Sequence, residues 1–407
     1  MRLIIAWRNL LAKPVQSSLT VLVVTAAITM MIVITLLFDG IHNGLVRATE
    51  PFDLIAGAKG SPNQLVLNTV FLQDVPIGNV SHELYEKLAA NPLVADAIPL
   101  AFGDNYKGYA IIGAGNNIFQ HQPKAGQQEW LQLAAGRPFT QAFEAVVGAK
   151  AARELGLKPG DNFKSIHGLL PGGEGHDHPY QVVGILQTVN GPYDQSILVP
   201  IESIWQAHEK HESSLAAEES TGDIHAEHEH EQEVTAILVK PKGYSEAMRL
   251  YQQFQQEPGG QLVFPAQVIV RLFALMGQGE QVLKTVASIV IVLGLMIMAL
   301  SLYWSALSRA RERAILRALG AGSRDIFAII LSEAAMLTGL GVVIGSLAGY
   351  GIYALAAKAL ETKTAIVLTV AFAPAEGYII IGGILFGLLA GVIPALFTYR
   401  EDVIQNL

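Results

Sequence analysis

Residues 19–38 read LTVLVVTAAITMMIVITLLF, a run of twenty residues that contains no charged side chain. A helix of about 20 apolar residues crosses the ~30 Å hydrocarbon core of a bilayer. Three further long apolar runs follow at residues 282–307, 326–356 and 378–397. We therefore predict a membrane protein with four transmembrane helices, one near the N-terminus and three in the C-terminal part.

The composition of the chain supports a membrane location. Of its 407 residues, 51% are hydrophobic and 15% are charged, and the mean hydropathy is +0.38. Soluble proteins carry about 25% charged residues. The chain has no cysteine, which excludes disulfides, thiolate metal sites and cysteine nucleophiles. A net charge of −8 without a basic region argues against a nucleic-acid partner.

The distribution of basic residues predicts the topology. Arginine and lysine cluster before the first run (residues 1–18) and between the second and third runs (308–325), whereas the segment before the fourth run has only Lys358 and Lys363. The positive-inside rule then places both termini, including the tail 398–407, and the arginine-rich segment in the cytoplasm. Residues 39–279 are predicted to lie outside.

The large outer region mixes helical and strand patterns. Residues 81–88 begin with a serine and show helical spacing of apolar residues, and residues 144–157 resemble a strand followed by a short helix that ends at Gly156. Strand-like runs bounded by glycine and proline occur at residues 109–113, 180–186 and 235–239. We expect an extracytoplasmic α+β domain inserted between transmembrane helices 1 and 2.

Glycine recurs in the third apolar run, at positions 339, 341, 345 and 349. Small residues at this spacing allow close packing of helices in lipid. The alternative is that these glycines only loosen a long helix, and the sequence favours neither interpretation.

Several short motifs carry a resemblance to a known family. They are AWRNLLAKP (6–14), GRPF (136–139), AVVG (145–148), LGLKPGD (155–161), RERAILRALGA (311–321) and SRDI (323–326). Together with the order of one span, a large outer domain and three spans, they are similar to FtsX-like, MacB-type ABC transporter permeases. The resemblance covers nearly the whole chain, and the arginine-rich segment is its most specific part.

The resemblance implies a dimeric permease of the bacterial inner membrane, paired with itself or with a paralogue, that works with a cytoplasmic ATPase and with a periplasmic binding or adaptor protein. No G-x-x-x-x-G-K-[ST] phosphate loop occurs, so we expect the ATPase, with its bound ATP, to be a separate subunit. In the family, the cytoplasmic segment docks on the ATPase and transmits its movement to the outer domain. The residues implied in this coupling are Arg309, Arg311, Glu312, Arg313, Arg317 and Arg324. From the residues alone, these arginines are more simply explained as topology determinants on the inner leaflet, and the resemblance reverses that preference.

Glu333 is an acidic residue near the cytoplasmic end of the third run. Carboxylates inside a membrane are costly unless they are paired or hydrated, which makes Glu333 a candidate functional residue. The alternative is a structural ion pair with an arginine of the preceding segment, such as Arg324.

Residues 208–233 contain five histidines, nine acids and one lysine, and this stretch accounts for the whole net charge of the chain. His176-Asp177-His178 lies nearby and is predicted to form a hairpin tip. Imidazole and carboxylate suit Zn²⁺, Ni²⁺ or Cu²⁺. The predicted metal ligands are His176, His178, His208, His211, His225, His228 and His230. The alternative is a solvated acidic loop whose histidines bind nothing.

The sequence is compatible with three functions. The first is a permease tied to metal handling, most simply of zinc. The second is export of lipoproteins, lipids, peptides or drugs, with an incidental histidine loop. The third is a scaffold that transmits ATPase motion to a periplasmic cell-wall hydrolase. No G-x-S-x-G or H-E-x-x-H motif occurs, and we expect no enzymatic activity of the chain itself.

Overall fold

The computed structural model describes residues 2–124, 126–168, 175–207, 232–308, 315, 321–364, 367–368 and 374–400. The chain divides into two compact units. The helical unit comprises Met1–Ile41, Leu275–Ala359 and Leu368–Leu407, and the sheet unit comprises His42–Ala274 and Leu360–Val367. The large domain between the first and second long helices is therefore confirmed.

The sheet unit is a mixed α+β structure. Its strands are β1 (Leu54–Gly57), β2 (Val80–Ser81), β3 (Val94–Tyr106), β4 (Tyr109–Ala114), β5 (Leu133–Gly136), β6 (Glu144–Val147), β7 (Asn162–His167), β8 (Gly175–Leu186), β9 (Ser196–Pro200), β10 (Glu233–Val234), β11 (Ala236–Pro241) and β12 (Gln261–Val263). Its helices are α3 (Pro62–Phe71), α4 (His82–Ala89), α5 (Ala149–Leu155) and α7 (Tyr244–Phe254), with short 3₁₀ turns η1 (Asn116–Gln120) and η2 (Pro192–Gln195).

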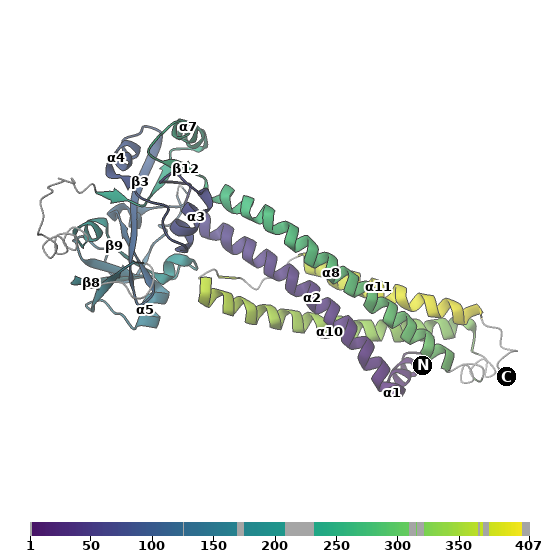
Figure 1. Cartoon of the computed structure of the whole chain (residues 1–407). Helices are drawn as coiled ribbons and strands as arrows, with labels where there is room; N and C mark the ends of the chain where they lie inside the picture. Colours follow the sequence, from purple (N-terminus) through teal and green to yellow (C-terminus); the bar gives the residue numbers. More distant parts are fainter. Residues whose placement is uncertain are drawn as a thin grey trace, which may run out of the picture. The chain divides into compact units, whose positions relative to one another are not determined.

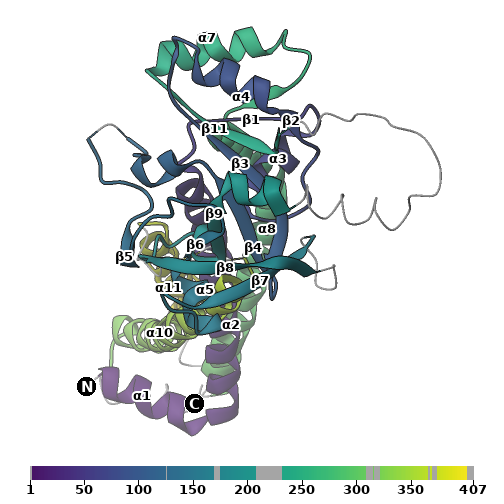
Figure 2. The same cartoon turned by 90° about the vertical axis from the view of Figure 1, so that its left-hand side faces the viewer.

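Within the described ranges, ten strands form one sheet in the order β12-β1-β11-β3-β4-β9-β6-β8-β5, with β7 paired to β3 and β8. The β4–β9 and β6–β8 pairs are parallel and the other pairs are antiparallel. Figure 2 shows β7 and β8 side by side, with β6 on the other side of β8. Strands distant in sequence therefore become neighbours, which no local pattern specifies.

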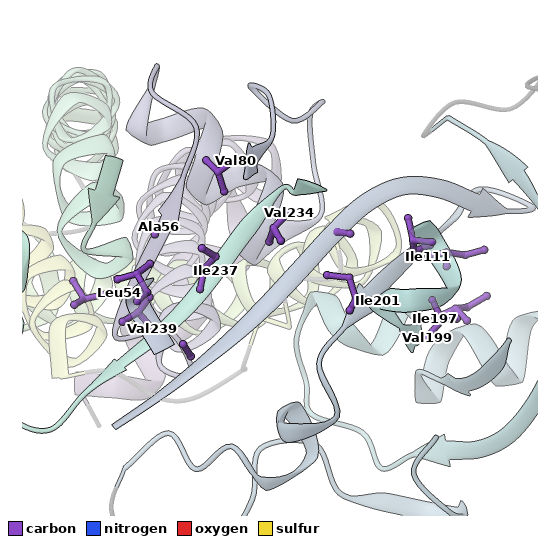
Figure 3. Packing of buried hydrophobic residues seen from close by; sticks show 14 of the residues in the cluster. Leu54, Ala56, Val80, Ile111, Ile197, Val199, Ile201, Val234, Ile237 and Val239 are labelled. Atoms are coloured by element: carbon purple, nitrogen blue, oxygen red, sulfur yellow. The ribbon is translucent and has the colours of Figure 1, made fainter. Parts of the chain in front are cut away.

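Successive residues of the central strands point to opposite faces of the sheet, and both faces are covered. One face packs Ile111, Ile197 and Ile237 against apolar residues of α4, α5 and α7. Figure 3 shows this side, where Leu54 and Val239 of β1 and β11 lie together and Ile197 and Val199 lie near Ile111. A sheet buried on both faces needs near-continuous apolar strands, as in Ser196–Pro200.

The opposite face of the sheet packs against the ends of two long helices. Leu45 and Val46 of α2 (Pro14–Thr49) and Ile269 and Leu272 of α8 (Pro265–Ser308) belong to this second core cluster, together with apolar residues of α3. These helix ends belong to the sheet unit itself. Both predicted boundaries of the outer region, at residues 39 and 279, therefore fall inside a helix, because α2 continues past residue 39 and α8 begins at Pro265.

The helical unit contains α1 (Arg2–Ala12), the remaining parts of α2 and α8, most of α10 (Ser323–Thr364) and the whole of α11 (Pro374–Arg400) (Figure 1). Among the described residues, four helices are long and apolar enough to span a membrane: Pro14–Thr49, Pro265–Ser305, Ser323–Glu361 and Glu376–Leu396. They confirm the four predicted spans, and most of them are longer than the apolar runs because polar helical turns extend them at the ends.

The glycines of α10 provide a contact surface for α2. A Cβ atom added at Gly341, Gly345 or Gly349 would lie 2.6–2.9 Å from side chains of α2, whereas one at Gly339 would meet nothing within 4 Å. Thr29 Oγ1 of α2 donates to the carbonyl oxygen of Gly345 at 3.0 Å. Of the two interpretations of the glycine spacing, close helix packing therefore holds for three of the four positions.

Candidate functional site

The two ends of the histidine-rich segment lie together on the sheet unit. Trp205 Nε1 donates to the carbonyl oxygen of Glu233 at 2.8 Å, and Glu233 pairs with Ser81 in the β10–β2 ladder. The backbone N–H of His82 donates to the carbonyl oxygen of Gln232 at 3.0 Å. These bonds define the foot of the segment. His208, His211, His225, His228 and His230 lie outside the described residues.

His82 occupies this foot, although in sequence it is far from the other histidines. Its ring packs edge-on against Trp205 with centroids 5.3 Å apart, and its Nε2 lies 3.8 Å from Glu86 Oε1 on the next turn of α4. Sequence reasoning treats His82 as an isolated residue, because only the β10–β2 pairing reveals its neighbours.

The His176-Asp177-His178 motif lies within β8 and not at a hairpin tip. Lys164 pairs with Pro179 and Ile166 pairs with Gly175, so β8 has two more residues than β7 between these pairs. The motif therefore occupies a β-bulge, a feature that redirects side chains and is frequent beside functional sites. For His176, the structure describes the backbone alone. His178 is exposed, and its ring packs against that of Phe143 with centroids 5.2 Å apart.

No group of three or more histidine, aspartate or glutamate side chains with metal-site geometry occurs among the described residues. The side chains of His176 and Asp177 and residues 208–231 lie outside the described part of the chain. The metal assignment of the seven predicted histidines therefore stays a prediction.

The GRPF motif forms a structural clasp in the sheet unit. Gly136 has φ +78°, and a Cβ there would lie 2.1 Å from the carbonyl oxygen of Val183, so only glycine fits. Arg137 holds both carboxylate oxygens of Glu144, with Nη1 to Oε2 at 2.9 Å, and the backbone N–H of Thr140 donates to Oε2 at 2.7 Å. The hydrogen bonds from Arg137, with those from the backbone, lower the pKa of Glu144 to about 2.

Glu333 makes a hydrogen bond to the N-terminal helix. It is 6% exposed on α10 and accepts from Asn9 Nδ2 of α1 at 2.5 Å. Ala6 of α1 is fully buried, while Trp7 and Leu11 are exposed. The sequence motif that contains Asn9 and the acidic residue of the third span therefore meet in space. The predicted pair of Glu333 with Arg324 stays a prediction.

Arg324 is exposed in the first turn of α10, where the Asp325 carboxylate accepts from the backbone N–H of Gly322 at 3.0 Å. Arg309, Arg311, Glu312, Arg313 and Arg317 lie outside the described residues. Their coupling role stays a prediction.

An apolar cleft of about 390 Å³ lies between α2, α8 and α11 in the helical unit. Its lining residues are Ile28, Met31, Ser288, Ile291, Val292, Leu295, Tyr378, Ile379, Gly382, Gly383 and Phe386. This volume falls in the range of about 300–1,000 Å³ that is typical of ligand sites.

The described residues thus show four helices long and apolar enough to span a membrane, with a large mixed domain between the first and the second. Residues 17–249 match the model of the MacB-like periplasmic core domain, and residues 284–403 match that of the FtsX-like permease C-terminal region. The first match covers more than half of the chain. The chain therefore belongs to the FtsX-like, MacB-type family of ABC transporter permeases, and the predicted family is confirmed.

Among curated proteins, the chain is similar to the uncharacterized ABC transporter permease YvrN of Bacillus subtilis (strain 168), with 26% identity over 226 residues. The match covers 53% of this chain and 52% of YvrN, so the chain spans about half the length of that relative.

Two solved structures resemble the chain. The periplasmic region of MacB from Actinobacillus actinomycetemcomitans has 11% identity and a TM-score of 0.34, covering 55% of this chain and 95% of that structure. The extracellular domain of the noncanonic ABC-type transporter YknZ from Gram-positive bacteria has 14% identity and a TM-score of 0.29, covering 52% and 98%.

Proposed function

We propose that the chain is the transmembrane subunit of an ABC transporter in which a separate cytoplasmic ATPase moves the sheet unit in the periplasm. The family assignment supports the class of protein. The packing of Leu45 of α2 and Ile269 of α8 into the core of the sheet unit supports mechanical transmission. Because these helix ends are part of that core, a displacement of either helix moves the sheet directly.

The arginine-rich segment is the proposed docking site of the ATPase, with the termini on the same cytoplasmic side. The positive-inside distribution and the exposure of Arg324 support this placement. Replacing Arg313 and Arg317 by alanine is expected to reduce co-purification of the ATPase and substrate-stimulated ATP hydrolysis. Replacing the exposed Arg249 of α7 is the matched control. Unchanged co-purification of the double variant would refute the docking role.

A second permease copy, identical or paralogous, is the proposed partner within the membrane. The exposure of the apolar residues Val286, Ile289 and Leu293 on one side of α8 supports such a partner. The chain has no cysteine, so a single cysteine at Val286 gives an unambiguous cross-linking test. A cross-linked dimer is expected for Val286→Cys and none for Val75→Cys, an exposed position of the sheet unit.

The transporter is proposed to handle a divalent metal, most simply Zn²⁺, captured by the histidine-rich segment. The observation that carries this proposal is the concentration of five histidines in residues 208–233, together with the H-D-H bulge on the same unit. Imidazole nitrogen is a preferred zinc ligand. Reversible capture suits delivery to a periplasmic binding or adaptor protein.

The test compares the full-length protein in nanodiscs with a variant in which a short Gly-Ser linker replaces residues 208–231. Isothermal titration with Zn²⁺ is expected to show several sites in the parent and fewer in the deletion. The same deletion in the chromosome should impair growth under zinc limitation. Equal zinc stoichiometry in both proteins would overturn the role of the segment.

The apolar cleft in the helical unit favours a second candidate function, export of a lipid-linked cargo. Its lining is almost wholly apolar, with Ser288 and Tyr378 as its polar groups. Gly382 lines the cleft, and a Cβ there would meet nothing within 4 Å, so Gly382→Leu is the variant chosen to narrow the cleft. Loss of co-purified lipid or lipopeptide from this variant, measured by mass spectrometry, would support this function. Unchanged lipid content would count against it.

A further inference from the structure

The end of α2 is joined to the rest of the sheet unit through His121. The ring of this residue is 2% exposed, and its Nε2 lies 2.7 Å from the carbonyl oxygen of Pro51. Pro51 lies in the short connection between Thr49, the last residue of α2, and Leu54, the first residue of β1. His121 therefore contacts the backbone where the chain passes from the first long helix into the sheet, and all of these residues belong to the sheet unit.

Aromatic side chains surround the same connection. Phe52 packs edge-on against Trp130 with centroids 5.2 Å apart, and Trp130 packs against Tyr193 at 4.7 Å. The ring of His121 lies 6.2 Å from that of Trp130, also edge-on. Tyr193 OH donates to the carbonyl oxygen of Thr69 of α3 at 3.0 Å. A displacement of the imidazole would therefore disturb Trp130 and the rings packed on it.

The segment that carries His121 is tied to two neighbouring strands of the sheet. Lys240 Nζ of β11 donates to the carbonyl oxygen of Gln122, the next residue along the chain. Asn117 Nδ2 of the preceding turn η1 donates to Asp96 Oδ1 of β3 at 2.8 Å. Because β3 and β11 pair with each other, the bond from the imidazole links this part of the sheet to the end of α2.

The contact with Pro51 fixes the tautomer of His121. A carbonyl oxygen only accepts hydrogen bonds, so Nε2 carries the proton and Nδ1 carries the lone pair. Nδ1 is buried and has no hydrogen-bond partner within the described part of the chain. A second proton on Nδ1 would therefore create a buried positive charge without an acceptor, unless the ring moves to reach water.

Three charged groups among the described residues act on the ring, namely Asp53 of the connection, Asp96 of β3 and Lys240 of β11. Burial is the largest influence and lowers the pKa of His121. The hydrogen bond to Pro51 raises this pKa, Lys240 lowers it, and the two carboxylates raise it, with a net lowering. Asp96 is directly opposite Lys240 in the β3–β11 ladder, so its charge is offset by that lysine. The ring is therefore neutral at neutral pH.

We propose that His121 is a proton-sensitive latch at the junction of α2 with the sheet. The neutral ring holds Pro51 and the end of α2 in place. Protonation draws the ring toward water, breaks the contact with Pro51 and loosens the packing on Trp130, so that the end of α2 moves more freely against the sheet. The signal is the pH of the compartment that surrounds the sheet unit. For its physiological meaning, the inference rests on the proposed transmission of helix movement to the sheet.

The first experiment measures protonation of the latch in full-length protein in nanodiscs. Trp7, Trp205 and Trp304 are replaced by phenylalanine, which leaves Trp130 as the only indole. A protonated imidazole quenches a neighbouring indole, so the fluorescence should fall in one step, with a midpoint below the ordinary histidine pKa of about 6.5. His121→Gln keeps a neutral N–H donor and cannot take up this proton, so the step should be absent from that variant.

The second experiment measures the freedom of α2. Because the chain has no cysteine, spin labels can be attached to cysteines introduced at Arg47 of α2 and Gln253 of α7, both of which are exposed. The distribution of distances between the labels should be narrow above the fluorescence midpoint and broad below it. A residue that only fills space would not give a distribution that changes with pH at this midpoint.

The variants separate the hydrogen bond from the charge. His121→Gln should give a narrow distribution at both pH values, whereas His121→Ala should give a broad one at both. His167→Gln removes another imidazole of the sheet unit, on β7, and is the matched control that should behave like the parent. Thermal unfolding establishes that each variant is folded, and if His121→Ala is not, the parent and His121→Gln decide between the outcomes.

A fluorescence step that persists in His121→Gln would overturn the inference, and so would a parent whose distance distribution is the same on both sides of the midpoint. The proposed function fails on a different result, namely unchanged co-purification of the ATPase with the variant in which Arg313 and Arg317 are replaced. The two failures are therefore distinguishable.

Discussion

Arg137 binds the carboxylate of Glu144 with both terminal nitrogens of its guanidinium group, and the backbone of Thr140 donates to the same carboxylate. Glu144 begins β6, while Arg137 follows directly after β5. The clasp therefore closes the loop between two strands that both pair with β8.

Replacing Glu144 by glutamine should destabilise the sheet unit. Hydrogen bonds to charged groups contribute about 1.5–3 kcal/mol, and a domain of this size loses about 2–4 °C in Tm per kcal/mol. Tryptophan fluorescence reports the transition, since Trp130 and Trp205 lie in this unit. The exposed Glu129→Gln is the control. Equal Tm values for the two variants would contradict the clasp.

The same pair predicts an acid dependence of stability. The pKa of Glu144 falls from its ordinary 4.5 to about 2 in the folded protein, because of Arg137 and the backbone donors. Because this pKa is lower in the folded than in the unfolded protein, the ionised Glu144 stabilises the fold fully above the pKa of the unfolded state. This stabilisation is lost as the pH falls from about 4.5 to about 2. The Tm difference between parent and Glu144→Gln should therefore shrink across this window. A constant difference would contradict the assignment.

The packing of α2 against α10 predicts opposite outcomes for two nearby glycines. Gly345→Leu inserts a side chain where Thr25 O and Ile28 Cβ already lie 2.9 Å from the Cβ position. Overpacking of this kind costs about 1–3 kcal/mol. Gly339→Leu meets open space and is the matched control. Thermal unfolding in one detergent should show a lowered Tm for the first variant only, and a similar loss in both would mean that the glycines serve flexibility.

The Asn9–Glu333 bond predicts energetic coupling between α1 and α10. Asn9→Ala and Glu333→Ala should each lower stability, and the double variant should lose less than the sum. Hydrogen bonds between membrane helices contribute about 1 kcal/mol in such cycles. Thermal unfolding of the four proteins measures this coupling. Strict additivity would show that the two side chains do not interact.

The foot of the histidine-rich segment predicts tolerance to its removal. Trp205, Gln232 and Glu233 hold the two ends through bonds that do not involve residues 208–231. The protein with the Gly-Ser linker should therefore keep its Tm within about 2 °C, since a change in the length of a connecting segment alters the free energy of unfolding only slightly. Trp205→Phe in the same background removes the indole donor and should lower the Tm. A large loss on deletion alone would show that the segment contributes to the core.

Local patterns predicted much of the architecture. The apolar runs specified the four spans, since a bilayer imposes a length on any helix that crosses it. Glycine at position 156 predicted a helix end, and it has φ +70° at the C-cap of α5. Ser81 is at the N-cap of α4, yet its side chain makes no cap hydrogen bond, because β2 and β10 already order the backbone there.

The candidate sites were less predictable. The H-D-H motif was expected at a turn because glycines precede it, whereas pairing with β7 extends β8 through it as a bulge. The ion pair of His167 with Asp104 was not predicted, because the two residues are 63 positions apart in sequence and become neighbours only through the β3–β7 pairing.

The sequence by itself determined the class of protein. The length of the apolar runs, the bias of basic residues and the family motifs can each be read from short stretches of sequence. The bilayer, the water and the backbone act on such stretches without reference to the rest of the chain. Tertiary structure decided which polar groups meet: Asn9 with Glu333, Asp104 with His167, and His82 with the foot of the histidine-rich segment. These encounters depend on strand register and helix packing across long separations, where the summed burial of many apolar residues outweighs any local preference.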